Sequence, residues 1–304
     1  MSTPAGPLSL PMTILSYSAW PLTMIVGLVG TAFAMASDHP LLWFNALYLA
    51  VALALGGLER VLPHERRWLA NDSQTLVDLA HTLLNKGAVQ LATAVALTLT
   101  VVATRVVEPS SVAPFALWPS QWPMFAQVAL ALVVAELGLY AAHRLAHEWG
   151  LMWRFHALHH SVTRLWFVNT GRFHVVDTFV KIALSQSLLW LLGAPLPVYV
   201  WFAAVTAFVG VLTHCNVDMR TGPLDLVFNT PNLHRWHHST DPAEGNRNYG
   251  ENLVLWDHLF GTYFNPPRRP PAEIGIKGEI AQGFLGQIAQ PFTARGVREI
   301  LGET

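Results

Sequence analysis

Long apolar runs dominate the pattern of hydrophobic and polar positions along the chain. A transmembrane helix needs about 20 consecutive, mostly apolar residues. One apolar region, about Val180–Leu212, contains Gly, Ala, Pro, Leu and Pro at 193–197. Because Gly and Pro end helices, this region predicts two short helices in a hairpin or re-entrant pair. Four other runs are long enough to cross a bilayer without a break, namely about Leu10–Met35, Leu41–Val61, Leu76–Val102 and Pro123–Ala142.

The composition supports a lipid environment. The chain is 52% apolar and only 12% charged, whereas soluble globular domains have about a quarter charged residues. The N-terminal segment has neither a basic start nor a small-residue cleavage site, so we expect its first apolar run to be a retained membrane helix. The net charge of −1 gives no indication of a nucleic-acid partner.

The basic residues are distributed unevenly among the segments between the apolar runs. The turn Asp38-His39-Pro40 has none, and the loop after the third run has only Arg105 at its edge. Since loops rich in Lys and Arg stay in the cytoplasm, four spans and a hairpin would place both termini and the histidine-rich segments on the cytoplasmic side. That side carries Arg60, Arg66, Arg67, Arg144, Arg154, Arg164, Arg172 and Lys181.

We expect one membrane-embedded domain over residues 1–304. Its expected parts are an N-terminal transmembrane part at 1–122, a histidine-rich core at 123–265 and a tail at 266–304. The tail contains an amphipathic piece near Gln287–Leu301, which we interpret as a peripheral helix or surface tail. The predicted fold class is therefore all-α, an integral membrane helix bundle with a cytoplasmic, histidine-rich helical cap.

Nine of the fourteen histidines fall into four short segments. On a helix, residues three or four apart share a face, so the histidines within each segment should project together. The segments hold His143 and His147 at the end of the fourth run, then His156, His159 and His160, then His214 after the hairpin, and finally His234, His237 and His238.

These nine imidazoles are too many for one metal ion. They fit two ions with four or five nitrogens each, and imidazole suits iron, zinc and copper. A lone histidine at a helix end is usually a cap or a surface group, but two HxxHH triplets and an HxxxH pair on one predicted membrane face are hard to explain in that way. We therefore expect all nine to be ligands of a dimetal site in the cap.

The order HxxxH, HxxHH, a lone His and HxxHH resembles the fatty acid hydroxylase / sterol desaturase superfamily of integral membrane di-iron enzymes. The match covers about Glu136–Tyr263, and the first three apolar runs are similar only in general character. The segment around 158–177 is closer to bacterial members that act on membrane lipids. Outside the histidines, the similarity lies in the sequences at 140–144, 230–239, 248–252 and 256–263.

The resemblance implies an oxygenase with two iron ions and O2 as co-substrate. It would remove a hydrogen from a C–H bond of a lipid or other hydrophobic substrate, giving an alcohol by oxygen transfer or an alkene by loss of a second hydrogen. Electrons would come from an external ferredoxin, cytochrome or reductase, since the chain has no nucleotide-binding Gly motif and only one cysteine. Zinc can occupy such a site in purified protein. The expected location is the bacterial inner membrane.

Four further polar residues are expected to support the ligands. Glu136 shares a helical stripe with His143, and we expect it to orient a ligand through the second ring nitrogen. Direct metal ligation and helix–helix hydrogen bonding are its alternatives. Asp257 and Asn248 either orient a ligand or cap a turn. His174 stands before Val175, where many relatives have proline, and we expect a supporting role rather than ligation.

Other polar residues allow more than one interpretation. Asp78, His81 and Asn85 share a face of the third run, where they would line a channel, meet the metal site or simply lie at the membrane interface. Arg164 and Arg172 have the chemistry to hold a phosphate or carboxylate, but we interpret them as membrane-surface charges.

Two other classes of protein fit the sequence less well. A membrane zinc hydrolase would need HExxH, but His147-Glu148 is followed by Trp, Gly and Leu. A metal transporter usually places its ligands near the middle of the membrane and often has inverted repeats. Here the histidines lie at or beyond the ends of the apolar runs and no repeat is visible, so an oxygenase fits better.

Overall fold

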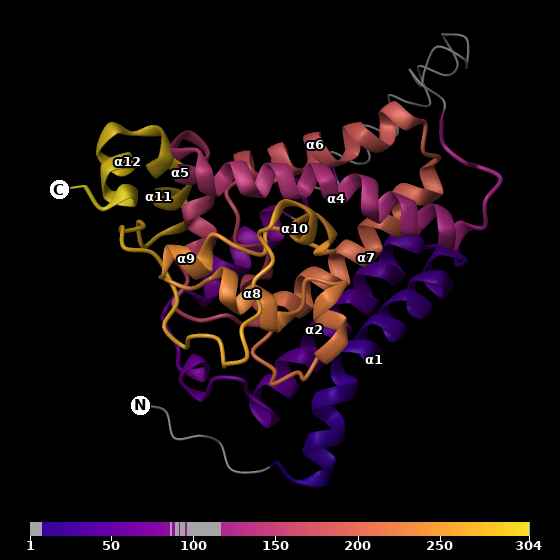
Figure 1. The fold of residues 1–304 in the computed structure, drawn as a ribbon, viewed down its shortest axis with the longest axis horizontal. Coiled ribbons are helices and arrows are strands. Elements are labelled where there is room, and N and C mark those ends of the chain that lie inside the picture. The colour runs from indigo at the N-terminus through magenta and orange to yellow at the C-terminus, as the bar shows by residue number, and fades with distance from the viewer. Residues whose placement is uncertain (1–7, 86, 89–90, 92–94, 96–116, 304) are drawn as a thin grey trace.

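A computed structural model describes residues 8–85, 87–88, 91, 95 and 117–303. Helices make up the regular structure of these residues, which contain isolated β-bridges but no strand. The all-α prediction is confirmed. In chain order the α-helices are α1 (Leu10–Met35), α2 (Pro40–Val61), α4 (Met124–Glu148), α5 (Gly150–His160), α6 (Val175–Leu192), α7 (Leu196–His214), α8 (Pro231–His237), α9 (Pro242–Gly245), α10 (Leu255–Phe260), α11 (Phe284–Ala289) and α12 (Ala294–Leu301) (Figure 1). The described residues also contain four 3-10 helices, η1 (Arg66–Leu69), η3 (Phe167–Gly171), η4 (Gly222–Leu226) and η5 (Gln290–Phe292).

Five helices are long and apolar enough to cross a membrane, namely α1, α2, α4, α6 and α7. The predicted bounds of α1 and α2 agree with the structure to within a residue, whereas α4 continues past the predicted end at Ala142 to Glu148. The predicted break at 193–197 is confirmed, since it separates two helices, but these helices are not short as predicted. α6 and α7 have 18 and 19 residues, and α6 ends at Gly193 in the left-handed conformation with φ of 80°. Polar residues at the start of α6 had hidden its true length.

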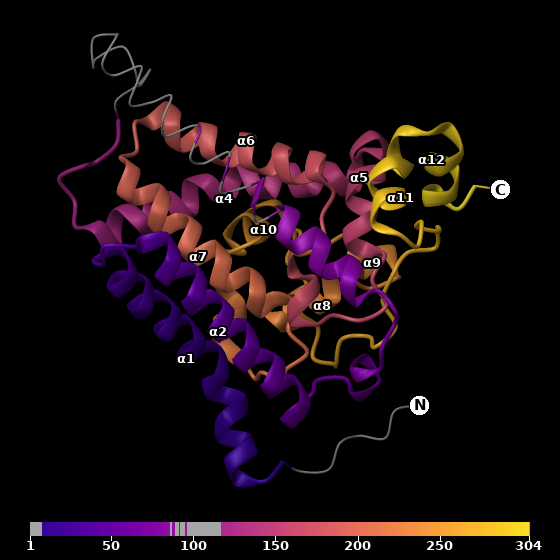
Figure 2. The ribbon, with the colours of Figure 1, turned by 180° about the vertical axis from the view of Figure 1, so that it is seen from behind.

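The third predicted span, about 76–102, lies mostly outside the described residues. Its first part, residues 75–85, is helical. This segment packs on the chain around η3, because Thr82 donates a hydrogen bond to the Val168 carbonyl and Asn85 donates to the Gly171 and Phe173 carbonyls. Seen from behind, it lies across the same end of the bundle as α5 (Figure 2).

Two apolar cores hold the long helices together. One joins α1, α2 and α7 around Trp20, Leu55 and Phe208, and the other joins α4, α6 and α7. Gly138 allows α4 to approach α6 closely, because a Cβ atom there would lie 2.5 Å from the Leu184 backbone. These contacts fix the direction in which the histidine-bearing ends of α4 and α7 point.

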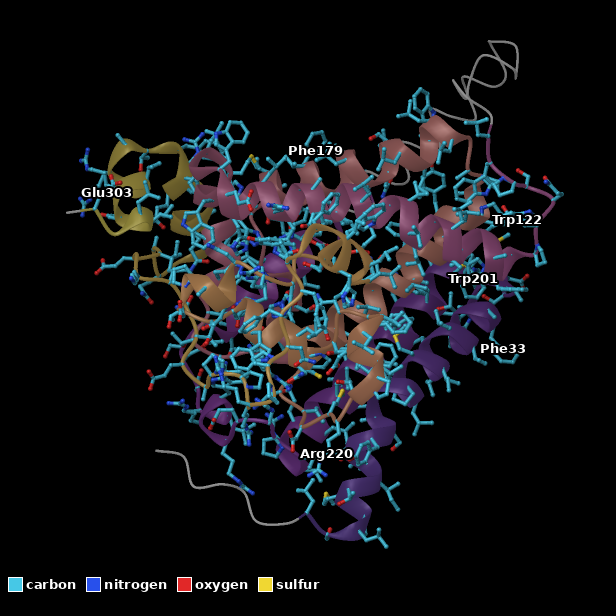
Figure 3. The ribbon with its side chains drawn as sticks, in the orientation of Figure 1. Phe33, Trp122, Phe179, Trp201, Arg220 and Glu303 are labelled. Atoms are coloured by element: carbon cyan, nitrogen blue, oxygen red, sulfur yellow. The ribbon has the colours of Figure 1, made fainter. Side chains whose placement is uncertain are left out.

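The outer surface of the long helices is apolar. Phe33 on α1 and Phe179 on α6 are 73% and 66% exposed, and both point away from the bundle (Figure 3). Large apolar side chains left exposed in this number are expected where lipid is the solvent. The structure therefore supports an integral membrane protein.

The short helices form a cap at one end of the bundle. α5, α8, α9 and α12 gather at the end where α4 and α7 finish, and the turns at 36–39 and 193–195 lie at the opposite end (Figure 1). All nine predicted ligands belong to this cap or to the helix ends that enter it. The prediction that the histidine segments share one end of the bundle is confirmed.

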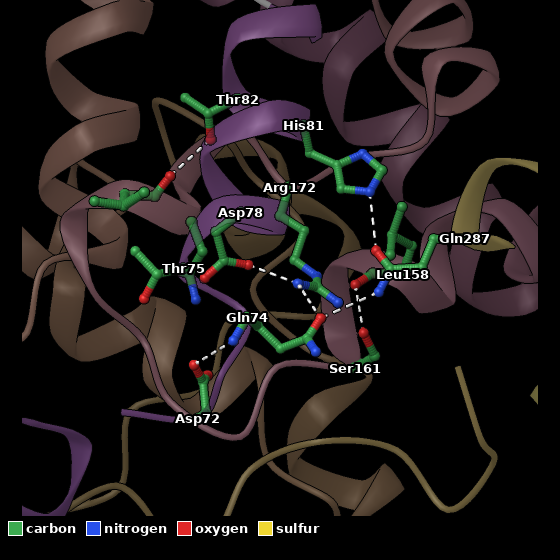
Figure 4. A network of polar contacts seen from close by, with 12 residues as sticks. Asp72, Gln74, Thr75, Asp78, His81, Thr82, Leu158, Ser161, Arg172 and Gln287 are labelled. Atoms are coloured by element: carbon green, nitrogen blue, oxygen red, sulfur yellow. Dashed lines mark hydrogen bonds and ion pairs between the residues drawn. The ribbon is translucent and has the colours of Figure 1, made fainter. Parts of the chain in front are cut away.

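Buried charges fasten the cap to the 75–85 helix. Arg172 pairs with Asp78 at 2.6 Å, and Gln287 of the tail contacts His81 at 2.9 Å (Figure 4). Arg164 similarly pairs with Asp72 at 3.0 Å. Our interpretation of Arg164 and Arg172 as membrane-surface charges is wrong, since both are buried and paired internally. The tail is likewise an anchored part of the fold.

Candidate metal centre

Five histidines from three helices converge in a first cluster. Its possible ligand nitrogens all lie within 4.8 Å of one another, and four of the five side chains are buried. The Nε2 atoms of neighbouring members approach to 3.0–3.1 Å. The members are His143 and His147 of α4, His156 and His160 of α5, and His237 of α8.

Four histidines form a second cluster beside the first. All are buried, and their possible ligand nitrogens also lie within 4.8 Å of one another. Neighbouring Nε2 atoms are 2.9–3.2 Å apart. The members are His159 of α5, His214 at the end of α7, His234 of α8 and His238 at the C-cap of α8.

The two HxxHH triplets do not project as units, contrary to the prediction. In α5, His156 and His160 enter the first cluster, but His159 enters the second. In α8, His237 separates in the same way from His234 and His238. The reason is that residues at i and i+4 are about 40° apart around a helix, whereas i and i+3 are about 60° apart on the other side. Each helix therefore lies between the two clusters and faces both.

Hydrogen bonds at Nδ1 fix the tautomers of several rings. Carbonyl and carboxylate oxygens only accept hydrogen bonds, so a ring nitrogen that contacts one must carry the proton. The Nδ1–H groups of His143, His156 and His237 donate to the Tyr249 carbonyl, the Asp177 carboxylate and the Arg247 carbonyl at 2.7–2.8 Å. His147 and His214 contact the Oδ1 atoms of Asn246 and Asn169 at 3.0 Å. These contacts leave the Nε2 lone pairs facing into the clusters.

A cation between the rings would satisfy these lone pairs. Two lone pairs that face each other at about 3 Å repel, and the Nε2 atom of His237 is buried without a hydrogen-bond partner among the described residues. Ligand nitrogens at right angles on an ion with bonds of about 2.1 Å lie about 3 Å apart, which matches the observed spacing. The residues present therefore fit one metal ion in each cluster.

The rings also have the charge state that metal binding requires. Burial, reinforced by the neighbouring imidazoles, lowers the pKa of the cap histidines well below its usual value, so the rings are neutral at pH 7. Neutral imidazole is the form that binds metal ions. This shift applies to His159, His160, His234, His237 and His238.

Glu136 and Asp257 support the site in a different way from the one predicted. Neither carboxylate contacts a histidine ring; both bind the loop at 249–252. Glu136 accepts hydrogen bonds from the Glu251 and Asn252 backbone, and Asp257 accepts from the Tyr249 and Gly250 backbone at 2.7–2.8 Å. Because the Tyr249 carbonyl holds His143, the two carboxylates act on the ligand through backbone.

Asn248 and His174 also contact backbone instead of ligands. Asn248 has a φ of 54° and its side chain donates to the Leu233 and Phe264 carbonyls, which ties α8 to the following loop. His174 caps α6 by accepting a hydrogen bond from Val176 N, and its Nε2–H donates to the Ile288 carbonyl of the tail. Among the described residues, the hydrogen-bond and ring contacts of His174 include no member of either cluster.

Three residues that orient ligands were missed by the sequence analysis. Asp177 holds His156, Asn169 holds His214, and Asn246 holds His147. Asp177 and Lys181 form an i, i+4 pair inside an apolar helix, and a charged pair in such a place indicates a functional site. That signal was available, whereas the two asparagines lie in loops whose positions the sequence does not define.

A pocket of about 330 Å³ opens onto the first cluster from the side of the cap. His147, His160 and His237 lie in its wall together with Trp153 of α5. The tail closes the opposite wall through residues 275–278 and the end of α12. The first cluster is therefore accessible to a small molecule from outside the bundle.

Comparisons with known proteins agree with this geometry. A family model for fatty acid hydroxylases matches residues 128–262, which include all nine clustered histidines. No solved structure gives a significant match. The ornithine lipid hydroxylase OlsE of Rhizobium tropici is 58% identical over 93% of this chain and 86% of its own length.

More distant relatives match about half of this chain. The alkylglycerol monooxygenase of Danio rerio is 30% identical over 48% of this chain, and the chain spans about a third (31%) of that relative. The Δ7-sterol 5(6)-desaturase ERG3B of Gibberella zeae is 27% identical over 53% of this chain and 49% of its own length. With the clusters, the membrane helices and the extended match to OlsE, the chain belongs to the fatty acid hydroxylase family of membrane oxygenases.

Proposed function

We propose that this protein hydroxylates an ornithine lipid or a closely related polar membrane lipid, using O2. The extended similarity to an ornithine lipid hydroxylase supports the substrate class, and the two buried histidine clusters support the reaction class. Desaturation is the alternative outcome, since a desaturase is among the relatives. The observation that carries the proposal is the convergence of nine neutral imidazoles into two adjacent clusters.

We further propose that the nine histidines bind two iron ions, one in each cluster. Bound iron would supply the redox chemistry that activates O2, which no amino acid side chain can supply. The protein's own residues hold the imidazoles in one tautomer through Asp177 and the Tyr249 carbonyl. The burial of all four rings of the second cluster also keeps bulk water from it, which protects a reactive centre from side reactions.

The helix ends suggest how the lipid reaches the site. The ligands of α4 and α7 lie at the ends of spanning helices, so a lipid can keep its chains in the bilayer while its reacting carbon lies near the clusters. An external ferredoxin, cytochrome or reductase would deliver the electrons, because the chain has one cysteine and cannot bind an Fe–S cluster through cysteine ligands.

The proposed location is the bacterial inner membrane, with the cap in the cytoplasm. The basic residues on the cap side support this orientation. A reporter fused after Thr304 should therefore be cytoplasmic, and one inserted in the turn at 36–39 should be periplasmic. The opposite pattern would contradict the orientation without affecting the chemistry.

The test of function is lipid analysis of cells that make ornithine lipid and express this chain. We expect a new ornithine lipid heavier by one oxygen atom, which a desaturase would not produce. His159→Ala and His237→Ala, one in each cluster, should abolish the product and lower the bound iron. His39→Ala, an exposed histidine at the far end of the bundle, is the matched control. Unchanged product from both cluster variants would refute the proposal.

A further inference from the structure

A second pocket, separate from the histidine clusters, lies on the outer side of α8. Its volume is about 270 Å³, and it lies between the end of α2, the segment after α7 and the chain at 268–270. Arginine is the most frequent residue in its wall. The charged residues that line it are Arg220, Arg235, Arg268 and Arg269, with Asp218 and Asp225.

The two carboxylates in the wall form no ion pair with these arginines among the described residues. Asp225 accepts hydrogen bonds from Thr221, Thr230 and Asn232. Asp218 contacts His64 at 3.4 Å, and it interacts with Arg235 and Arg269 only at longer range. With four guanidinium groups and two carboxylates, the lining of the pocket has an excess of positive charge.

Three of the arginines have no acidic partner in the described part of the chain. Arg268 pairs with Glu244 and also lies over the Trp236 ring. Arg220 and Arg269 are exposed at the rim, and Arg269 donates a hydrogen bond to the His64 carbonyl. Exposed guanidinium groups that form no ion pair are an effective site for phosphate or carboxylate oxygens.

Arg235 is the most informative of the four. It is only 1% exposed. Its Nη2 group donates to the Cys215 and Val217 carbonyls at 2.9 and 2.8 Å, while its Nε atom is buried without a partner in the described structure. A buried cation is costly unless an anion pairs with it. Arg235 forms no direct ion pair in the described structure and interacts with Asp218 and Glu59 only at longer range, so an anion bound in this pocket would be favourable.

The pocket lies at the level where lipid headgroups would be. Arg220 N donates to the Ser16 carbonyl in the second turn of α1, and its side chain lies near the Tyr17 ring. Figure 3 shows Arg220 beside the start of α1, at the end of the bundle that carries the cap. Because α1 enters the membrane there, a lipid headgroup can reach the pocket without leaving the bilayer.

We propose that this pocket binds the phosphate or carboxylate group of a membrane lipid, with Arg235 in its wall and Arg220 and Arg269 at its rim. Arg235 stands between His234 and His237 on α8, so an anion bound to it would hold that helix from the side opposite the clusters. The site does not depend on the hydroxylation reaction, because its residues are separate from all nine clustered histidines.

The test uses full-length protein purified in detergent and the double variant Arg220→Gln/Arg269→Gln. Arg235 stays unchanged because it holds two carbonyls beside His214. Arg66→Gln is the matched control, because Arg66 is exposed, lies in η1 outside the pocket lining and forms no ion pair with a described residue. Mass spectrometry of intact protein–lipid complexes would compare phosphatidylglycerol with phosphatidylcholine, and thermal unfolding would compare inorganic phosphate with chloride at equal ionic strength.

We expect wild type and Arg66→Gln to prefer phosphatidylglycerol, and the double variant to bind it about tenfold more weakly, because two solvent-exposed charge pairs, each of modest strength, are lost. Stabilisation by inorganic phosphate that disappears in the double variant, without any lipid preference, would support the anion site and assign it to a soluble phosphate. Equal binding of both probes by wild type and double variant would overturn the proposal.

Discussion

Replacement of Asp177 tests how the first cluster is held together. Its carboxylate accepts the Nδ1–H of His156 at 2.8 Å and lies 3.8 Å from Lys181 Nζ, with both partners buried. Asp177→Ala leaves the imidazole N–H without this acceptor, which costs about 1–3 kcal/mol. It also leaves Lys181 paired with Glu251 alone. Because the lost hydrogen bond selects the nitrogen that faces the cluster, we expect metal affinity to fall about 10–100-fold.

The assay is the retention of metal under chelator challenge. Iron-loaded protein would be incubated with increasing chelator, and the metal per chain measured by mass spectrometry. Asp177→Asn is the matched variant, because its amide oxygen can still accept the same hydrogen bond, and we expect it to retain more metal than Asp177→Ala. A thermal unfolding midpoint separates metal loss from unfolding. If Asp177→Ala retained metal as well as wild type, the orienting role of Asp177 would be refuted.

Two further predictions concern packing and pH. Gly138→Ala should destabilise the protein by roughly 1–3 kcal/mol, because the new Cβ atom would clash with the Leu184 backbone. Gly57→Ala is the control, since its Cβ atom would meet no atom within 4 Å. Equal thermal unfolding midpoints of the two variants would contradict the close packing of α4 on α6. Burial lowers the pKa of His64 to about 3, and its pKa in the unfolded chain is about 6.5. The unfolded state therefore takes up the proton first, and stability falls as the pH drops below about 6.5. Between pH 6 and pH 5, the free energy of unfolding of wild type should fall by about 1 kcal/mol more than that of His64→Gln. Equal changes of the two unfolding free energies with pH, measured by chemical denaturation, would contradict this.

The spans and the clustering of the nine histidines could be predicted from the sequence because both depend on local patterns. Apolar length predicts a spanning helix wherever the structure describes one, although the charged start of α6 concealed its length. Histidine spacing predicts a dimetal site because few other kinds of functional site contain so many imidazoles. The number of nitrogens expected for each ion, four or five, agrees with the clusters of four and five.

The partners of those residues could not be predicted, because they depend on how distant segments meet. Glu136 lies in line with His143 along α4, yet its carboxylate binds a loop more than 100 residues away, at separations of 115 and 116 residues. Arg172 looked like a surface charge, but the 75–85 helix brings Asp78 against it. A stripe on one helix indicates which residues share a face, and says nothing about which segment covers that face.

The position of α5 and α8 between the two clusters has a consequence for how metal is taken up. An ion bound in either cluster would fix the rotation and height of both helices, and so place the remaining histidines for the second ion. The entropic cost of ordering α5 and α8 would then reduce mainly the affinity for the first ion. The second ion would bind to a site that is already formed. Loading should therefore be cooperative, with chains that hold a single ion scarce at intermediate metal concentrations.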